Sequence, residues 1–488
     1  MTVINTNTAS LSAQYNLGKV NKAMGEAMEQ LSSGKRINSA SDDAAGLAIS
    51  TRQDAQIKGL DQAIRNAADG QSLIDTTEGA HEEITNILQR MRELAVQASN
   101  DTNASSDRTS LQAEITQLTN EIDRIASQTT WNGSSLMDGS FSAKQLQIGA
   151  DQGQSISFSV ANASVSNLGS HLKEGLAISN ATNAVAGSAI NLSGHLGAVN
   201  ITTSAAASAK AAAALVNAQT DNTGIEATAV TKASLNTISA AGTVAFTLKG
   251  DNGTAASISA SVSNVSHLGT LRDAINTQSG VTGITAAFGT ATAELILTHA
   301  SGETIDISGY TNSGHATATM KLDALDKNAA SISDSSTLTE GGVITANVTG
   351  QLTTSSAKAF TITETNATAT QGHFASTGGA SAASSVSTIN IGSVTGAQAA
   401  ISVIDGALDQ ISIARSDLGA ISNRLDHTMS NLGNISMNTQ AAKSGIEDAD
   451  FAKLTGELTK SQIMSQAATA MLAQANASKQ GVLSLLQG

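Results

Sequence analysis

Residues 401–437 read ISVIDGALDQISIARSDLGAISNRLDHTMSNLGNISM, and an apolar side chain stands there at every seventh position. These positions are Ile404, Ile411, Leu418, Leu425 and Leu432. Such a spacing is typical of a helix that packs lengthwise on another helix, because seven residues make about two helical turns. The stretch therefore predicts a long helix with a narrow apolar seam. That seam needs a covering helix from the same chain or from another copy.

Both ends of the chain carry seams of the same kind. Near the N-terminus the apolar positions step by four and three, at Ala13, Leu17, Val20, Met24, Ala27 and Leu31. A last helix is predicted from Phe451 to Leu486. In it, small and apolar residues recur at sevens, namely Ala468, Ala475 and Val482, flanked by Met464, Met471 and Leu485. A chain with helical seams at both ends must either pair them with each other by folding back or pair them with the helices of other copies.

After the N-terminal seam, the sequence predicts two antiparallel helices. The spacing of its apolar residues then changes. A long helix is expected from Ala44 to about Ser99, with Asp42 or Asp43 as its N-cap. The polar segment NDTNASSD at 100–107 reverses the chain, and a second helix follows with Leu111, Ile115, Leu118, Ile122 and Ile125 on one face. Past Gln128 the period falls to two, and Gly and Asn between alternating residues predict a β-hairpin region.

The middle of the chain, from about 170 to 400, is rich in Ala, Ser, Thr, Gly and Asn. The segment GDNG at 250–253 predicts a hairpin turn between two strands. Residues 216–227 (VNAQTDNTGIEA) and 275–286 (INTQSGVTGITA) are identical at six of twelve positions. Each copy follows a helical stretch and precedes a strand, so two related α+β modules are predicted. A disordered, solvated surface region is the alternative.

The composition narrows the class of protein. The chain has 488 residues, a formal net charge of -14, no cysteine and no proline. The length suggests about three domains. Without cysteine, disulfides and thiolate metal sites are excluded. The negative charge argues against a nucleic-acid partner, which would require a basic patch. No segment approaches the roughly 18 consecutive apolar residues of a membrane span, so no membrane insertion is expected.

Two further features concern export and folding. The N-terminal segment has no charge before Lys19 and no compact apolar core, so it is not a cleavable secretory signal. The protein either stays inside the cell or is exported by a dedicated apparatus. Average usage would give about 24 prolines. Their absence removes the slow cis/trans step from folding, although compositional drift explains the count equally well.

Several long motifs closely resemble bacterial flagellins. They are LSSGKRINSASDDAAGLAIS (31–50), QRMRELAVQ (89–97), SDLGAISNRLDHTMSNLGNI (416–435) and MLAQANASKQGVLSLLQ (471–487). The resemblance covers about 1–165 and 400–488. A weaker similarity links LRDAINTQSGVTGITAAFG (271–289) to modules inserted in flagellins and hook-associated proteins.

The resemblance implies an elongated, multi-domain fold that is mostly helical at the termini, with coiled-coil packing, a β-hairpin and inserted α+β or β-rich outer domains. Residues 1–43 with 451–488 would form a terminal coiled coil facing the filament channel. Residues 44–175 with 401–450 would form a helical rod that carries the β-hairpin. The outer domain would cover 176–400, with two related modules at about 176–240 and 241–330 and a return segment.

The resemblance also implies a function. Flagellins are structural subunits that assemble into the flagellar filament for swimming, and they are exported unfolded, without a cleaved signal, by the flagellar type III system. The expected location is extracellular. The expected partners are other copies of the chain, an export chaperone, the filament cap and hook-associated proteins. A hook–filament junction protein and a surface adhesin with flagellin-like ends are the alternatives; close similarity at both termini and few aromatic residues in the middle disfavour them.

The terminal seams are the predicted assembly surface. Two helices with one narrow seam each bury too little surface to offset an ordering cost of about 1–2 kcal/mol per residue. The ends are therefore expected to be disordered in the monomer and to fold on docking. The residues predicted to serve self-assembly are Leu17, Val20, Met24, Leu31, Ile411, Leu418, Leu425, Leu432, Met471, Val482 and Leu485.

A second predicted site is a polar ridge with a protruding leucine. Gln89, Arg90, Leu94 and Gln97 share one stripe of the long helix, and Glu114 lies on its partner helix. The plain interpretation is a contact between subunits. In flagellins the matching positions are also read by the animal flagellin receptor of the Toll-like class. The resemblance therefore implies recognition of the released monomer at these residues.

No catalytic, metal or cofactor site is predicted. HEEIT at 81–85 begins like a zinc-protease helix, but Thr85 stands where the second histidine ligand is needed. The other seven histidines are dispersed and are expected to be solvated surface imidazoles. At 443–450 the chain reads KSGIEDAD where many flagellins have an arginine-rich version, which predicts the loss of a salt bridge.

Overall fold

The computed structural model describes residues 6–180, 187–342, 345–365, 372–374 and 379–487. Side chains are described in these ranges except at 179–180, 333–334 and 479–487. The chain forms two compact units. Unit 1 comprises Met1–Asp75, Ala143–Ser159 and Gly419–Gly488, and unit 2 comprises Thr76–Ser142 and Val160–Leu418.

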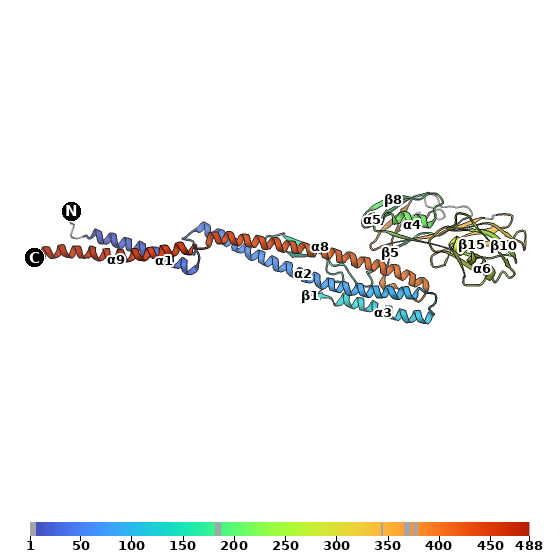
Figure 1. The fold of residues 1–488 in the computed structure, drawn as a ribbon, viewed down its shortest axis with the longest axis horizontal. Coiled ribbons are helices and arrows are strands. Elements are labelled where there is room, and N and C mark those ends of the chain that lie inside the picture. The colour runs from blue at the N-terminus through green and yellow to red at the C-terminus, as the bar shows by residue number, and fades with distance from the viewer. Residues whose placement is uncertain (1–5, 181–186, 343–344, 366–371, 375–378, 488) are drawn as a thin grey trace. The chain divides into compact units, whose positions relative to one another are not determined.

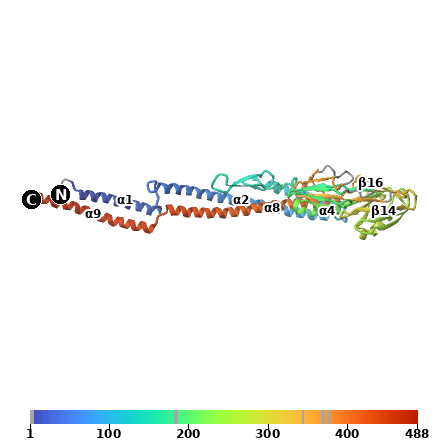
Figure 2. The same ribbon diagram turned by 90° about the horizontal axis from the view of Figure 1, so that it is seen from above.

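The terminal helices pair within unit 1. Helix α1 (Thr8–Ser33) and helix α9 (Phe451–Gln487) lie side by side and antiparallel (Figures 1 and 2). Asn7 caps the start of α1 through its side-chain oxygen, and its Nδ2 donates a hydrogen bond to the carbonyl of Ala475 at 3.2 Å. Helix α1 ends at Gly34, whose φ of 71° is the left-handed conformation that glycine adopts without strain.

The first part of α2 (Ala44–Ala98) and the last part of α8 (Val394–Glu447) form the rest of the helical body of unit 1. Their apolar faces meet in a buried cluster around Leu60 and Leu432. Asp43 caps α2 by accepting a hydrogen bond from a first-turn N–H at 2.9 Å. The prediction of a carboxylate cap and of a helix that ends near residue 99 is confirmed.

A β-hairpin packs on α2 in unit 1. Strands β3 (Lys144–Gln147) and β4 (Ser155–Phe158) pair antiparallel, which confirms the predicted β-hairpin region. Asn66 donates a hydrogen bond to the last carbonyl of β3 at 2.9 Å. A Cβ added at Gly70 would lie 2.5 Å from Leu146 Cδ2, so glycine at this position lets the hairpin lie directly on the helix.

The helical part of unit 2 consists of the rest of α2, α3 (Ser105–Gln128) and the first part of α8. Helix α3 ends at the residue where the sequence period changes, as predicted. The Arg108 guanidinium holds the reversal between α2 and α3 by donating to two carbonyls at the end of α2, at 2.9 and 3.0 Å. Helix α8 begins before the predicted stretch 401–437, and the Ser393 hydroxyl caps its start by accepting a hydrogen bond from the Gly396 N–H at 3.0 Å.

The described strands of unit 2 form several sheets. A five-stranded sheet has the order β11-β10-β14-β17-β6, a four-stranded sheet has the order β20-β19-β7-β8, and β9 lies between β13 and β18 in the largest sheet. The first strands and helices are β1 (Thr130–Trp131), β2 (Ser134–Ser135), β5 (Gly169–Glu174), β6 (Ile178–Asn180), β7 (Ala189–Ser193), β8 (Ala198–Thr202), α4 (Ala209–Asn217), α5 (Thr220–Thr223), β9 (Glu226–Asn236), β10 (Gly242–Lys249) and β11 (Ala256–Val262). The remaining ones are α6 (Gly269–Thr277), α7 (Ser279–Thr282), β12 (Ile284–Phe288), β13 (Leu295–His299), β14 (Ile305–Asn312), β15 (Thr319–Leu325), β16 (Ser331–Thr339), β17 (Ala346–Thr349), β18 (Gln351–Ser356), β19 (Thr361–Glu364), β20 (Gly379–Ala380), β21 (Ala382–Ser385) and the 3-10 helix η1 (Val386–Thr388).

The sequence repeat corresponds to a structural repeat. In each copy a helix, a single-turn helix and a strand follow one another, α4-α5-β9 and α6-α7-β12. The Asn217 amide clamps Ala227 by donating to its carbonyl at 2.9 Å and accepting from its N–H at 2.7 Å. Asn276 clamps Ala286 at the same two distances. The shared asparagine therefore fixes each helix to the strand that follows it.

The topology differs from the predicted pair of consecutive modules. In the first copy, β7 pairs with β8 and β19, and β9 pairs with β18. In the second copy, β10 pairs with β11 and β14, and β12 pairs with β13. The whole second copy lies in the sequence between β9 and β18. The first copy is therefore interrupted by the second, and a boundary at about residue 240 does not separate them.

The fold class is confirmed: long helices at both termini, a β-hairpin and a middle rich in α+β and β structure. The predicted GDNG hairpin is present as the β10–β11 pair. Among the residues whose structure is described, no helix is both long and apolar enough to cross a membrane.

Candidate functional site

The terminal seam is visible in the burial of α1 and α9. On α1, Val20 and Ala27 are buried, and the predicted Leu17, Met24 and Leu31 are half-buried. The inner face of α9 also steps by four and three. It is formed by Leu454, Leu458, Ser461, Ser465, Ala468, Leu472 and Ala475.

Other large apolar side chains of the terminal pair remain uncovered. The predicted Met471 is 64% exposed, so it lies off the seam that faces α1. Phe451, Ile463 and Met464 of α9 and Leu11 and Tyr15 of α1 are exposed as well. Val482 and Leu485 lie on the last turns of α9, where side chains are outside the described residues. Large apolar groups in water mark a surface that is suited to covering by another protein chain.

A groove of about 500 Å³ runs along the terminal pair. Its walls mix apolar and charged groups, from Lys19, Val20, Ala23, Glu26, Ala27, Gln30, Glu457, Lys460, Ser461 and Met464. The groove has both signs of charge and an apolar floor around Val20 and Ala27. These properties suit the side of a further helix.

The heptad residues of α8 are buried in the single chain. Ile411, Leu418, Leu425 and Leu432 are 2%, 2%, 0% and 7% exposed within the single chain. They are therefore covered by their own chain and do not present a surface to other copies, and their predicted role in self-assembly stays a prediction. Any contribution of these residues to assembly passes through the helices that they hold together.

The polar ridge on α2 is present without its leucine. Gln89, Arg90 and Gln97 are exposed, but Leu94 is 1% exposed and belongs to the buried face of α2. The protruding leucine was a wrong prediction, because Leu94 lies three residues from the buried Met91 and so points to the same side of the helix. The predicted ridge therefore presents only polar groups.

Arg90 organises this ridge electrostatically. Its guanidinium donates to Glu93 at 2.9 Å and to Glu114 of α3 at 2.9 and 3.0 Å. These hydrogen bonds, to Glu93 and then to Glu114, raise the pKa of Arg90. Arg92, which sequence reasoning missed, makes a similar link from α2 to Asp405 of α8 at 2.6 Å. Exposed arginine–carboxylate pairs thus tie both neighbouring helices to α2 on this face.

Four of the seven histidines predicted to be solvated surface imidazoles are buried or half-buried, and the other three are exposed as predicted. His81, His299 and His373 are buried, and His171 and His195 are half-buried, while His267, His315 and His427 are exposed. Burial lowers the pKa of His81 to about 4, with Glu78 opposing and Arg415 adding to that effect. Among the described side chains, no group of three or more His, Asp and Glu residues is arranged to hold a metal ion.

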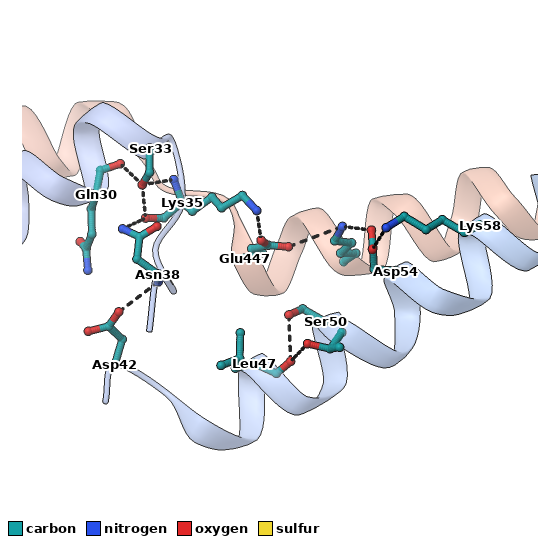
Figure 3. A network of polar contacts seen from close by, with 12 residues as sticks. Gln30, Ser33, Lys35, Asn38, Asp42, Leu47, Ser50, Asp54, Lys58 and Glu447 are labelled. Carbon is teal, nitrogen blue, oxygen red and sulfur yellow. Dashed lines mark hydrogen bonds and ion pairs between the residues drawn. The ribbon is translucent and has the colours of Figure 1, made fainter. Parts of the chain in front are cut away.

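The segment 443–450, which lacks the arginines of many flagellins, still forms a salt bridge through its lysine. Lys443 of α8 lies 2.7 Å from Asp54 of α2 (Figure 3). Hydrogen bonds from Lys443 and Lys58 lower the pKa of Asp54 to about 2. This pair is formed by the chain's own lysine, and the predicted loss of the contact made by the arginine-rich version stays a prediction.

Comparison with known proteins agrees with this arrangement. The chain matches the bacterial flagellin N-terminal helical region at residues 4–142 and the bacterial flagellin C-terminal helical region at residues 401–486. It is 43% identical to a B-type flagellin of Pseudomonas aeruginosa, over 99% of both chains. It is 34% identical to flagellin D of Vibrio anguillarum and 36% identical to a flagellin of Salmonella rubislaw, again over 99% of each chain. With helical ends, a β-hairpin and similarity along its whole length, the chain belongs to the bacterial flagellin family.

Proposed function

We propose that this flagellin is the repeating structural subunit of an extracellular flagellar filament and that copies join through the exposed faces of α1 and α9. The observation that carries the proposal is the uncovered apolar surface of the terminal pair. Among the described residues, Phe451, Ile463, Met464 and Met471 of α9 are exposed in the single chain. Burying them against a neighbouring copy would contribute about 25 cal/mol for each Å² removed from water.

The charges of the termini support the same proposal. Residues 1–43 contain four basic and four acidic side chains, so this end is neutral while the whole chain carries -14. Neutral ends avoid mutual repulsion when many copies bring them together. The net negative charge lies in the rest of the chain. We further propose that the chain acts without catalysis or a cofactor, as a structural protein.

We propose export in the unfolded state through the flagellar type III channel. The supporting feature is a chain without cysteine and proline. Such a chain cannot form a disulfide before export, and its refolding outside has no prolyl isomerisation step. An export chaperone, the filament cap and hook-associated proteins are the proposed partners. The similarity of the whole chain to flagellins disfavours a junction protein or an adhesin.

Truncation tests the assembly proposal. Removing residues 1–35 or 455–488 should leave a soluble monomer whose remaining units unfold cooperatively but that does not extend filament seeds. Electron microscopy of seeded samples reads out assembly, and circular dichroism during heating reads out folding. Long filaments grown from either truncated chain would contradict the proposal.

We also propose that the polar ridge of α2 is recognised, on the released monomer, by the animal Toll-like flagellin receptor. Gln89, Arg90 and Gln97 are accessible in the single chain, and Arg90 holds Glu114 of the neighbouring helix in a fixed position. Leu94 contributes only by fixing the helix from inside. The partner would therefore meet a mainly polar surface in which Val96, 47% exposed beside Gln97, is the apolar group within reach.

A further inference from the structure

The segment that follows α1 and the segment that precedes α9 lie side by side in unit 1. After α1, the Arg36 N–H donates to the carbonyl of Glu447 at 2.7 Å, and the Ala449 N–H donates to the carbonyl of Gly34 at 3.0 Å. Lys35 forms an antiparallel bridge with Asp448 between these two bonds. The chain therefore enters α2 and leaves α8 through a short two-stranded ladder, although some 400 residues lie between the two segments.

A row of alternating charges reinforces this ladder (Figure 3). Lys58 lies 2.8 Å from Asp54, Asp54 lies 2.7 Å from Lys443, and Lys443 lies 3.8 Å from Glu447. Glu447 also pairs with Lys35. The Glu447 side chain is only 12% exposed, so water screens this pair less than an ordinary surface pair. We name the ladder and these five side chains the junction clasp.

The seam of α1 and α9 does not by itself specify one alignment. Four of the seven inner positions of α9 are small, namely Ser461, Ser465, Ala468 and Ala475. Heptad seams tolerate sliding by seven residues because the apolar pattern then repeats, and small side chains make shallow knobs that resist sliding weakly. A device outside the seam is needed to select one register.

We propose that the junction clasp sets the register of the antiparallel pair formed by α1 and α9. It holds the last turn of α1 beside the first turn of α9, so pairing becomes a local event with a high effective concentration. A slide by one heptad would move α9 about 10 Å along α1. The ladder would have to open for such a movement, and the five charged side chains hold it closed. The relevance to filaments rests on the proposed function, but the register itself is a property of one chain.

Cysteine pairs measure the register, since the natural chain has no cysteine. Ser465 Oγ donates to Asn21 Oδ1 at 3.3 Å across the seam, so Asn21→Cys with Ser465→Cys is the in-register pair. Asn21→Cys with Leu472→Cys is the pair shifted by one heptad. Mild oxidation of dilute full-length monomers traps whichever alignment forms, even briefly. Intramolecular disulfides are quantified by mass spectrometry after proteolysis.

The in-register pair should cross-link at least about tenfold more than the shifted pair, because about 10 Å of displacement is beyond disulfide reach. Neutralising the clasp with Lys443→Gln and Glu447→Gln should bring the two yields to within about twofold. Lys443→Arg keeps the charge and should keep the preference. Arg124→Ala is the matched control, since it removes an exposed ion pair with Glu121 on α3, outside unit 1.

An unchanged preference in the neutralised chain would overturn the proposal, and so would equal yields in the parent chain. Seeded filament growth is scored separately on the same variants. If the parent chain and Lys443→Arg keep the in-register preference but do not grow filaments, the proposed assembly surface is wrong and the clasp proposal is supported. If the preference is lost while growth continues, the clasp sets the register but the filament tolerates other alignments.

Discussion

The seam of α8 and the seam between α1 and α9 have the same heptad spacing but opposite degrees of burial. The α8 residues Ile411, Leu418 and Leu425 are almost fully buried in the single chain. Along α1 and α9 most seam residues are half-buried, and Met471 is exposed nearby. The spacing therefore predicts that a helix packs on another helix, but the number of neighbouring elements decides how much of it is covered.

The difference separates residues that hold the monomer together from residues left for a neighbour. In unit 2, α8 shares a body with α2 and α3, so its apolar face meets more than one partner. The described part of α1 packs along α9 alone (Figure 2). A seam with one partner leaves two flanks open to water. Those flanks are the proposed place of contact between copies.

The largest expected effect is on the stability of the monomer, and it tests the difference between the two seams directly. Leu425→Ala should lower the free energy of unfolding of the monomer by about 2–5 kcal/mol, because it removes a fully buried side chain. Met471→Ala should change it by less than about 0.5 kcal/mol and should instead slow filament growth from seeds. Denaturant unfolding and electron microscopy measure the two effects. Equal destabilisation by both substitutions would remove the distinction between the two seams.

An effect of intermediate size is expected on the pH dependence of the free energy of unfolding. It arises at a buried histidine in unit 2 and does not involve α1 or α9. Burial lowers the pKa of His81 to about 4 from 6.5. The unfolded chain therefore takes up the proton first, and stability that is complete above pH 6.5 is lost as the pH falls toward 4. The loss from this group between pH 7 and pH 4.5 should be about 2 kcal/mol.

His81→Leu provides the test of that pH effect. Neither ring nitrogen of His81 has a hydrogen-bond partner among the described residues, so leucine removes no bond and should remove the pH-dependent loss. Urea unfolding of the parent and variant at both pH values measures the difference. If the variant loses as much stability as the parent on acidification, another group is responsible.

The smallest effect on stability is expected at the polar ridge. Arg90→Ala with Glu114→Ala removes an ion pair whose side chains are about half exposed, so the free energy of unfolding should change by less than about 1 kcal/mol. Signalling through the animal flagellin receptor should nevertheless be strongly reduced. Arg124→Ala is the control, because it breaks a similarly exposed ion pair with Glu121, which lies within α3 and includes no residue of the ridge. Full signalling by the double variant would refute the proposed recognition.

Local patterns in the sequence predicted the helices well and the surfaces less well. The end of α3 at Gln128, the Asp43 cap and the β3–β4 hairpin all follow from short-range signals. Leu94 was misplaced because one helix face was assumed to be covered, whereas unit 2 places helices on two sides of α2. The buried histidines were missed because a lone histidine carries no periodic signal.

Long-range pairing was beyond the sequence for a physical reason. The strand β18 returns to β9 only after the entire second copy of the repeat, and no local period encodes that return. The junction clasp joins Lys35 to Asp448, which are far apart in the sequence, and no local pattern predicts this pairing. Such contacts depend on which segments the fold brings together, since each partner alone is an ordinary polar residue.

The sequence by itself determined the family, the helical ends and the repeated module, because the spacing of apolar residues and the order of motifs are local properties of the sequence. Only the tertiary structure decided which heptad residues are buried, which copy of the repeat interrupts the other, and how the termini are joined at the clasp. Periodicity specifies the direction in which a side chain points from its own helix or strand. Burial and ion pairing depend on what stands opposite, and that is settled only when distant segments meet.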